Sequence, residues 1–135
     1  MAVDKGLNPF SFPASADLSA KQYHCVSLAS DGEVQAVSSA GAYTMGILQN
    51  DPAAVGRAAT VQTLAGTVVR VEASTTATGA ISVGSQLISA AAGKAIVAST
   101  GGSAYIWGRA VEALTTGNQL IISAMITHEG AASTA

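Results

Sequence analysis

Apolar and polar residues alternate with a period of two along much of the chain, in short runs that end at glycine-marked turns. The stretch "TVVRVEA" at residues 67–73 shows this pattern, because Val69 and Val71 alternate with charged neighbours. Such alternation predicts β-strands with one face toward a core. Hairpin turns are expected at Gly32, which follows an aspartate, and at Gly93, which precedes a lysine. The pattern predicts an all-β fold of many short strands.

The second half of the chain repeats the first in order and spacing. The stretches "GAYTMGILQNDPAAVG" (41–56) and "SAYIWGRAVEALTTG" (103–117) both hold a tyrosine, two residues and a glycine, with another glycine about ten residues later. Three markers keep nearly one register: Gly32 and Gly93 are 61 residues apart, Gly56 and Gly117 are 61 apart, and Tyr43 and Tyr105 are 62 apart. We interpret the chain as a pseudo-duplicated β unit, a small barrel or sandwich.

This interpretation gives one β domain with an extended N-terminal arm and a short tail. The arm is residues 1–16, the domain residues 17–128 with halves at about 17–73 and 79–127, and the tail residues 129–135. Small, polar residues fill the tail, which is therefore expected to be flexible.

The arm, "MAVDKGLNPFSFPASA", contains both phenylalanines of the protein. Its prolines favour extended backbone, and Phe10 and Phe12 then project to one side of it. A solvated tail rarely carries both phenylalanines, so we predict an arm that docks onto a partner or a neighbouring subunit; a disordered tail is the alternative. The candidate contact residues are Leu7, Asn8, Pro9, Phe10 and Phe12.

Composition narrows the possible partners. Hydrophobic residues make up 49% of the 135 residues, aromatic ones only 4%, and much of the apolar content is alanine. A small domain with few large core side chains favours stability gained from an oligomer or a larger assembly. The net charge of -2 and the scattered basic residues argue against nucleic-acid binding.

Membrane and secretory signals are not visible in the sequence. The apolar stretch "LIISAMI" is far shorter than the roughly 20 residues of a membrane helix, and "MAVDKGLNPF" lacks the apolar region of a signal peptide. The single cysteine, Cys25, excludes an internal disulfide and fits a reducing compartment. We therefore expect synthesis in a cytoplasm.

No constellation of residues predicts catalysis, a metal or a cofactor. His24 and Cys25 are adjacent, so in a strand they point to opposite faces and cannot form a nucleophile–base pair; a buried cysteine beside an exposed histidine is expected. No metal-ligand spacing, nucleophile elbow or phosphate-binding loop is present. Lys94 lies on a predicted turn, as in biotin or lipoate carrier domains, but "AAGKAIV" lacks their sequence context.

Three residues of one predicted strand are candidates for a subunit interface. Tyr105 and Trp107 share a face at i, i+2 spacing and are large anchors in an aromatic-poor chain. Packing in the core is the alternative for both aromatic side chains. Arg109 pairs with an acid across an interface or is solvated, and the sequence leaves both open.

The chain resembles the tailed-phage head decoration, or capsid cement, proteins. The resemblance covers roughly residues 18–127 and rests on "SDGEVQAV", "MGILQNDPAAVGRAATVQTLAGTVVRVEA", "GSQLISAAAGKAIVAS" and "WGRAVEALTTGNQLIISAMI". It implies a compact fold of the β-tulip type, often a homotrimer, on the outer surface of an expanded phage capsid. There it would bridge major capsid protein subunits and stabilise the shell, with no catalytic residues to carry over.

Two other classes of function stay open. A receptor- or glycan-binding surface module of a virion is the first, and exposed aromatic side chains in a groove would favour it. An enzyme is the second of these classes and ranks last, because the sequence has no catalytic constellation.

Overall fold

The computed structural model describes residues 9–99, 103–115 and 118–131, which fold into ten β-strands. No helix occurs among these residues, so no helix there can cross a membrane. The strands are β1 (Phe10–Pro13), β2 (Cys25–Leu28), β3 (Val34–Ala36), β4 (Gly46–Leu48), β5 (Ala58–Gln62), β6 (Val68–Ser74), β7 (Gln86–Ser89), β8 (Ala95–Val97), β9 (Tyr105–Ala110) and β10 (Asn118–Ala131). The all-β prediction is confirmed.

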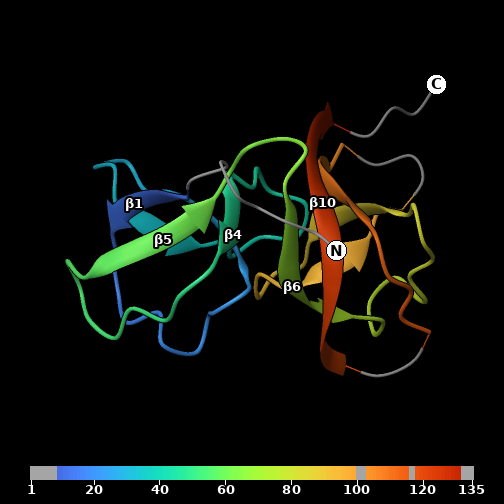
Figure 1. The fold of residues 1–135 in the computed structure, drawn as a ribbon, viewed down its shortest axis with the longest axis horizontal. Coiled ribbons are helices and arrows are strands. Elements are labelled where there is room, and N and C mark those ends of the chain that lie inside the picture. Colours follow the sequence, from blue (N-terminus) through green and yellow to red (C-terminus); the bar gives the residue numbers. More distant parts are fainter. Residues whose placement is uncertain (1–8, 100–102, 116–117, 132–135) are drawn as a thin grey trace.

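The strands form two five-stranded units that lie side by side (Figure 1). The first unit has the strand order β1-β5-β4-β2-β3, and the second is a closed barrel of order β10-β6-β8-β7-β9. Figure 1 shows β6 standing where the units meet, with the long strand β10 beside it. The units divide in the segment 63–67, between β5 and β6, whereas the sequence analysis placed the division at 73–79.

The two units have the same topology, so the doubled pattern of the sequence is a doubled fold. The last strand of each unit, β5 or β10, pairs with the first strand, β1 or β6. It also pairs with the strand at the Tyr-x-x-Gly motif, β4 or β9. That strand pairs in turn with the first strand of a hairpin, β2 or β7. A parallel bridge then joins the first strand to the hairpin, Ala14 to Val34 in the first unit and Ala73 to Ala95 in the second.

The equivalent hairpins also share their turn geometry. Gly32 and Gly93 both have a positive φ, 86° and 92°, which glycine adopts without the strain that a Cβ would add. Their amides donate to the carbonyls of Ala29 and Ala90, each at 3.0 Å. The two predicted hairpin turns are therefore present and alike.

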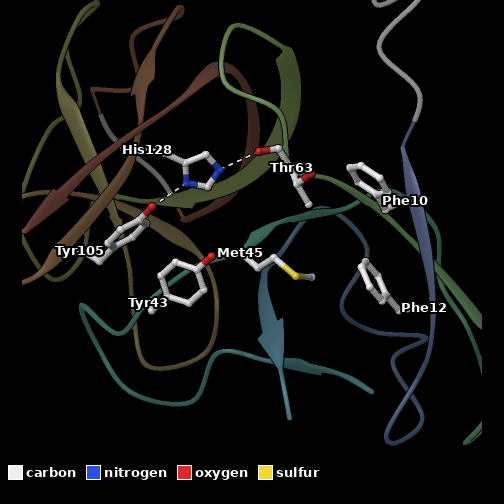
Figure 2. Close-up of a pocket in the computed structure, with 7 residues that line it drawn as sticks. All are labelled: Phe10, Phe12, Tyr43, Met45, Thr63, Tyr105 and His128. Atoms are coloured by element: carbon white, nitrogen blue, oxygen red, sulfur yellow. Dashed lines mark hydrogen bonds between the residues drawn. The ribbon is translucent and has the colours of Figure 1, made fainter. Parts of the chain in front are cut away.

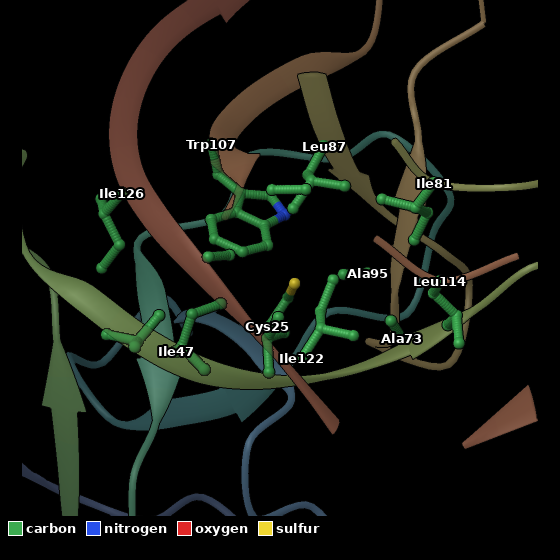
Figure 3. Packing of buried hydrophobic residues seen from close by; sticks show 14 of the residues in the cluster. Cys25, Ile47, Ala73, Ile81, Leu87, Ala95, Trp107, Leu114, Ile122 and Ile126 are labelled. Atoms are coloured by element: carbon green, nitrogen blue, oxygen red, sulfur yellow. The ribbon is translucent and has the colours of Figure 1, made fainter. Parts of the chain in front are cut away.

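Buried side chains from both units share one core. The largest cluster surrounds the fully buried Trp107 inside the barrel (Figure 3), and Cys25, Val37 and Ile47 of the first unit belong to it. A second cluster, which includes Val26, fills the first unit. Because burial of apolar surface is the main stabilising term in folding, the shared cluster couples the two units.

Both ends of the described chain differ from the predicted arm and tail. The predicted arm is extended at Phe10–Pro13, but these residues pair as β1 with β5 of the same chain. The predicted tail begins at residue 129, yet β10 continues to Ala131 through pairs with β9. Leu7, Asn8 and residues 132–135 lie outside the described residues.

Candidate functional site

An open pocket of about 350 Å³ lies at the junction of the two units (Figure 2). Four aromatic side chains dominate its walls, and no aspartate, glutamate, lysine or arginine is among the described residues that line it. The lining residues are Phe10, Phe12, Tyr43, Met45, Thr63, Tyr105 and His128. An apolar pocket with a few placed polar groups is the usual form of a binding site.

The two tyrosines of the repeated motif meet in this pocket. The ring centroids of Tyr43 and Tyr105 are 4.8 Å apart in an edge-to-face arrangement, which suits the quadrupoles of aromatic rings. Tyr43 is 57% exposed, and Phe10 on the opposite side of the pocket is 49% exposed. Desolvation, together with the neighbouring Tyr43, raises the pKa of Tyr105, so its hydroxyl stays protonated.

His128 holds the wall of the pocket in one geometry. Its Nε2 lies 2.7 Å from the carbonyl oxygen of Thr63, and its Nδ1 lies 2.6 Å from the hydroxyl of Tyr105. A carbonyl only accepts, so Nε2 carries a proton and donates to Thr63, while Nδ1 and the Tyr105 hydroxyl share the second hydrogen bond. Both ring nitrogens are therefore occupied, and the hydrogen bonds connect β9 and β10 to the end of β5.

An irregularity in β10 aims His128 at the pocket. Ile126 pairs with Gly108 and Gly130 pairs with Ile106, so residues 127–129 face only one residue of β9. His128 has a φ of 49° and Gly130 one of 84°. A bulge of this kind redirects a side chain out of the regular alternation, here into the wall of the pocket.

The same bulge carries an exposed ion-pair network beside the pocket. Glu129 accepts two hydrogen bonds from Arg109, from Nε at 2.6 Å and from Nη2 at 2.9 Å. Gln86 and Thr127 also donate to this carboxylate. The hydrogen bonds from Arg109, ahead of the others, lower the pKa of Glu129. Arg109 thus has an acidic partner within its own chain.

Trp107 is not available to a subunit interface. Its side chain is fully buried in the barrel core, so the predicted interface role of Trp107 is wrong and the core-packing alternative holds. In a chain with so few aromatic residues, burying the indole in the core stabilises the fold more than leaving it exposed at the surface would. Tyr105 lies half-buried in the pocket wall, and an interface role for it stays a prediction.

The histidine and the cysteine that adjoin in the sequence have separate environments. His24 is buried, not exposed as predicted. Its ring keeps polar partners there, because Glu72 lies 3.7 Å from Nε2 and the backbone carbonyl of Gln22 accepts from Nδ1. Cys25 belongs to the shared core. Burial raises the pKa of the Cys25 thiol to about 12, which keeps the sulfur from acting as a nucleophile.

Lys94 does not have the environment of a carrier lysine. Its side chain is only 17% exposed, and its Nζ lies 3.8 Å from Glu72. A residue that carries a covalently bound cofactor has to project freely from its turn. The carrier-domain alternative is therefore not supported.

Comparison with known proteins decides the family. The profile described as "Phage cement protein" matches residues 11–125, most of the chain. The chain belongs to the phage cement protein family. It is a capsid-associated structural protein of a phage, and the resemblance drawn from the sequence is confirmed.

A solved structure has the same fold as this phage cement protein. The match is the crystal structure of the head fiber gp8.5 N base in bacteriophage phi29, at 20% sequence identity and a TM-score of 0.60. It covers 89% of this chain and 93% of that chain. No curated protein matches the sequence.

The sequence analysis missed the pocket, although it identified several of its residues. Phe10 and Phe12 were predicted to be contacts of an arm, and no role was predicted for His128, which adjoins the predicted tail. The signal that could have found the site is the repeat itself, since Tyr43 and Tyr105 occupy equivalent positions in two units that must pack together.

Proposed function

We propose that the protein binds the outer surface of an assembled phage capsid and stabilises the shell by bridging neighbouring major capsid subunits. The observation that carries this proposal is the family match over residues 11–125. The shared core supports it, because two units that pack as one body can transmit a load between the subunits they touch. Symmetry repeats each contact over the shell, so modest contacts suffice.

The proposal includes self-association as a homotrimer on the capsid and synthesis in the host cytoplasm. The small share of aromatic residues supports an assembled state, because few large side chains are available to a single chain. Leu7 and Asn8 remain candidate contacts of the N-terminal segment, together with Pro9 and Phe10. Phe12 packs partly against the core of the first unit, so it also serves the fold.

We propose a structural role without catalysis. Among the described residues, no group of three histidine, cysteine, aspartate or glutamate side chains could hold a metal ion. The histidine at position 128 has both nitrogens engaged by Tyr105 and Thr63. These features favour a structural role for His128 and its neighbours over a role in proton transfer.

The test uses phage heads assembled without the protein, to which the purified chain is added. Quantitative mass spectrometry then counts the bound copies, and heating of the heads measures the temperature at which the shells open. We expect a copy number similar to that of the major capsid protein and a higher opening temperature. A few copies per head, with no change in that temperature, would argue against a cement role.

The open aromatic pocket favours a second candidate function, recognition of a receptor or glycan at the virion surface. Exposed aromatic faces such as those of Tyr43 and Phe10 can stack on a sugar ring. Binding of the purified protein to a glycan array tests this candidate. Specific binding that competes with attachment of the phage to its host would favour it over the capsid-bridging proposal.

A further inference from the structure

The pocket occupies a place in the first unit that buried side chains fill in the second. Strand register gives the equivalences. Ala14 and Ala73 form the equivalent parallel bridges, so the residues two and four positions earlier correspond. Gly46 and Gly108 end the repeated motif. The residue after Gly46 pairs with Gln62, and the residue after Gly108 pairs with Met125, so Gln62 and Met125 correspond. The equivalent pairs are Phe10 and Val69, Phe12 and Val71, Met45 and Trp107, and Thr63 and Ile126.

Three of these pairs differ in burial, whereas Met45, at 8% exposed, is buried like Trp107 and belongs to the cluster of the first unit. All four residues of the second unit belong to its core cluster, and Trp107 and Ile126 are fully buried. In the first unit the corresponding four line the pocket, where Phe10 is 49% exposed. Met45 stands where the other unit has an indole, and Figure 2 shows its side chain between the aromatic walls. The first unit thus leaves open a space that the second unit fills.

The lining of the pocket suits an apolar occupant more than a sugar. The hydroxyl of Tyr105 and both nitrogens of His128 are already engaged in hydrogen bonds. The hydroxyls of Tyr43 and Thr63 also line the pocket, but they are too few for the several hydroxyl groups of a buried sugar, which would lose water at a cost in free energy. An aromatic or large aliphatic side chain would bury apolar surface against Phe10 and Tyr43.

A second copy of the chain is a poor source of that side chain. The sequence has six aromatic residues. Four of them line the pocket, Trp107 is fully buried and Tyr23 is half-buried. An aromatic occupant is therefore better supplied by a different protein.

We infer that the pocket binds one aromatic side chain, of about the size of an indole, presented by the capsid surface. This inference rests on the proposed function for the source of the side chain. The chemical class follows from the internal comparison, because the second unit closes the same space with Trp107. A buried aromatic anchor in a pocket is the usual centre of a protein interface.

The first experiment titrates free indole into the purified protein and follows the methionine methyl signals by NMR. Met45 lies in the pocket, whereas Met125 is exposed on β10 and serves as an internal reference. We expect a saturable shift at Met45 and none at Met125. Thr63→Ile copies the filled unit and should weaken indole binding at least about tenfold, the effect of an interface hot spot.

Two results of this titration would overturn the inference. One is the absence of a saturable shift at Met45, or equal shifts at both methionines. The other is a saturable shift with methyl glucoside and none with indole, which would assign the pocket to a sugar.

The second experiment measures binding to heads that lack the protein. Met45→Trp places an indole where the second unit has one, and Tyr43→Ala removes an exposed wall, so it disturbs the fold little. We expect each change to weaken binding at least about tenfold. Val55→Trp, at a residue that is 66% exposed and outside the pocket, is the matched control and should bind like the wild type.

The outcomes separate the inference from the proposed function. Wild-type binding with no loss in either pocket variant would overturn the capsid-derived occupant and leave the cement role standing. Failure of the wild-type protein to bind heads would overturn the cement role and this source of the side chain together. The indole titration would then decide the chemistry of the pocket by itself.

Discussion

Gly46 and Gly108 hold equivalent places in the two units and allow two strands to approach closely. A Cβ at Gly108 would lie 2.5 Å from the carbonyl oxygen of Met125, and one at Gly46 would meet the carbonyl oxygen of Gln62. Backbone atoms of a paired strand cannot give way as the end of a side chain can. The glycine in each Tyr-x-x-Gly motif is therefore required by packing.

We expect Gly46→Ala to destabilise the protein by about 1–3 kcal/mol, the range for overpacking of a tight interior. The matched control is Gly32→Ala, where no atom lies within 4 Å and only the positive φ opposes a side chain. That control should cost about 1 kcal/mol. Urea unfolding measures both. A cost for Gly46→Ala no larger than that of the control would show that the strands can move apart.

The residues of the pocket show that a sequence pattern can predict equivalent positions but not contacts between them. Tyr43 and Tyr105 were predicted as markers of a repeat, and their spacing in the chain says nothing about contact. The fold brings their rings to 4.8 Å because the two units pack against each other. The predicted exposure of His24 failed for a similar reason, since Glu72 on β6 covers it.

The strand β10 is the element that the sequence described least well. Its last residues are small and polar, which predicted a flexible tail from residue 129. In the structure Glu129 accepts hydrogen bonds from Arg109 on the neighbouring strand, and the bulge at 127–129 keeps β10 paired as far as Ala131. Polar residues can continue a strand when a partner satisfies them, and the partner is distant in sequence.

The lowered pKa of Glu129 predicts a loss of stability in acid. A folded-state pKa below that of the unfolded chain contributes stability above the ordinary pKa of a glutamate. This contribution is lost as the pH falls through the lowered pKa. We expect Glu129→Gln to reduce the melting temperature at neutral pH and to lose this difference from the wild type in acid, as measured by thermal unfolding across that range.

Glu33→Gln is the control for this experiment, because the neighbouring Asp31 raises the pKa of Glu33. A raised pKa contributes stability below the ordinary value and loses it as the pH rises. The two variants should therefore respond to pH in opposite directions. The difference in stability between Glu129→Gln and the wild type could also be the same in acid as at neutral pH. That result would exclude the ion pair with Arg109 as the cause of the difference.

The whole molecule consists of two units with one shared core, so we expect it to unfold in one step. Ile47 of the first unit is fully buried in the cluster around Trp107 of the second (Figure 3). Ile47→Ala should destabilise both units together by about 2–5 kcal/mol. Fluorescence of Trp107, the single tryptophan, reports the second unit, and the Met45 methyl signal reports the first.

Exposed Val55 is in the first unit, and Val55→Ala should change the stability by less than about 0.5 kcal/mol. The two reporters should show coincident transitions in the wild type and in both variants. Separate transitions for Trp107 and Met45 would mean that the shared core does not couple the units.

The sequence by itself determined the strands, the hairpin turns and the duplication. These features depend on local alternation, on glycine at positive φ and on residue order, all of which can be read along the chain. The family followed from the same pattern, because it is spread over most of the chain. Among the described residues, the hairpins at Gly32 and Gly93 match this expectation in geometry.

Only the tertiary structure decided which copy of each repeated position is buried and which is open. Val69 is 5% exposed in the second unit, whereas its counterpart Phe10 is 49% exposed in the pocket, and the two positions look alike in the pattern of apolar residues. Burial depends on what the neighbouring strands bring to the same place, and those strands are far apart in sequence. For this reason the pocket, and the contact between Tyr43 and Tyr105 in it, exist only once the two units have packed together.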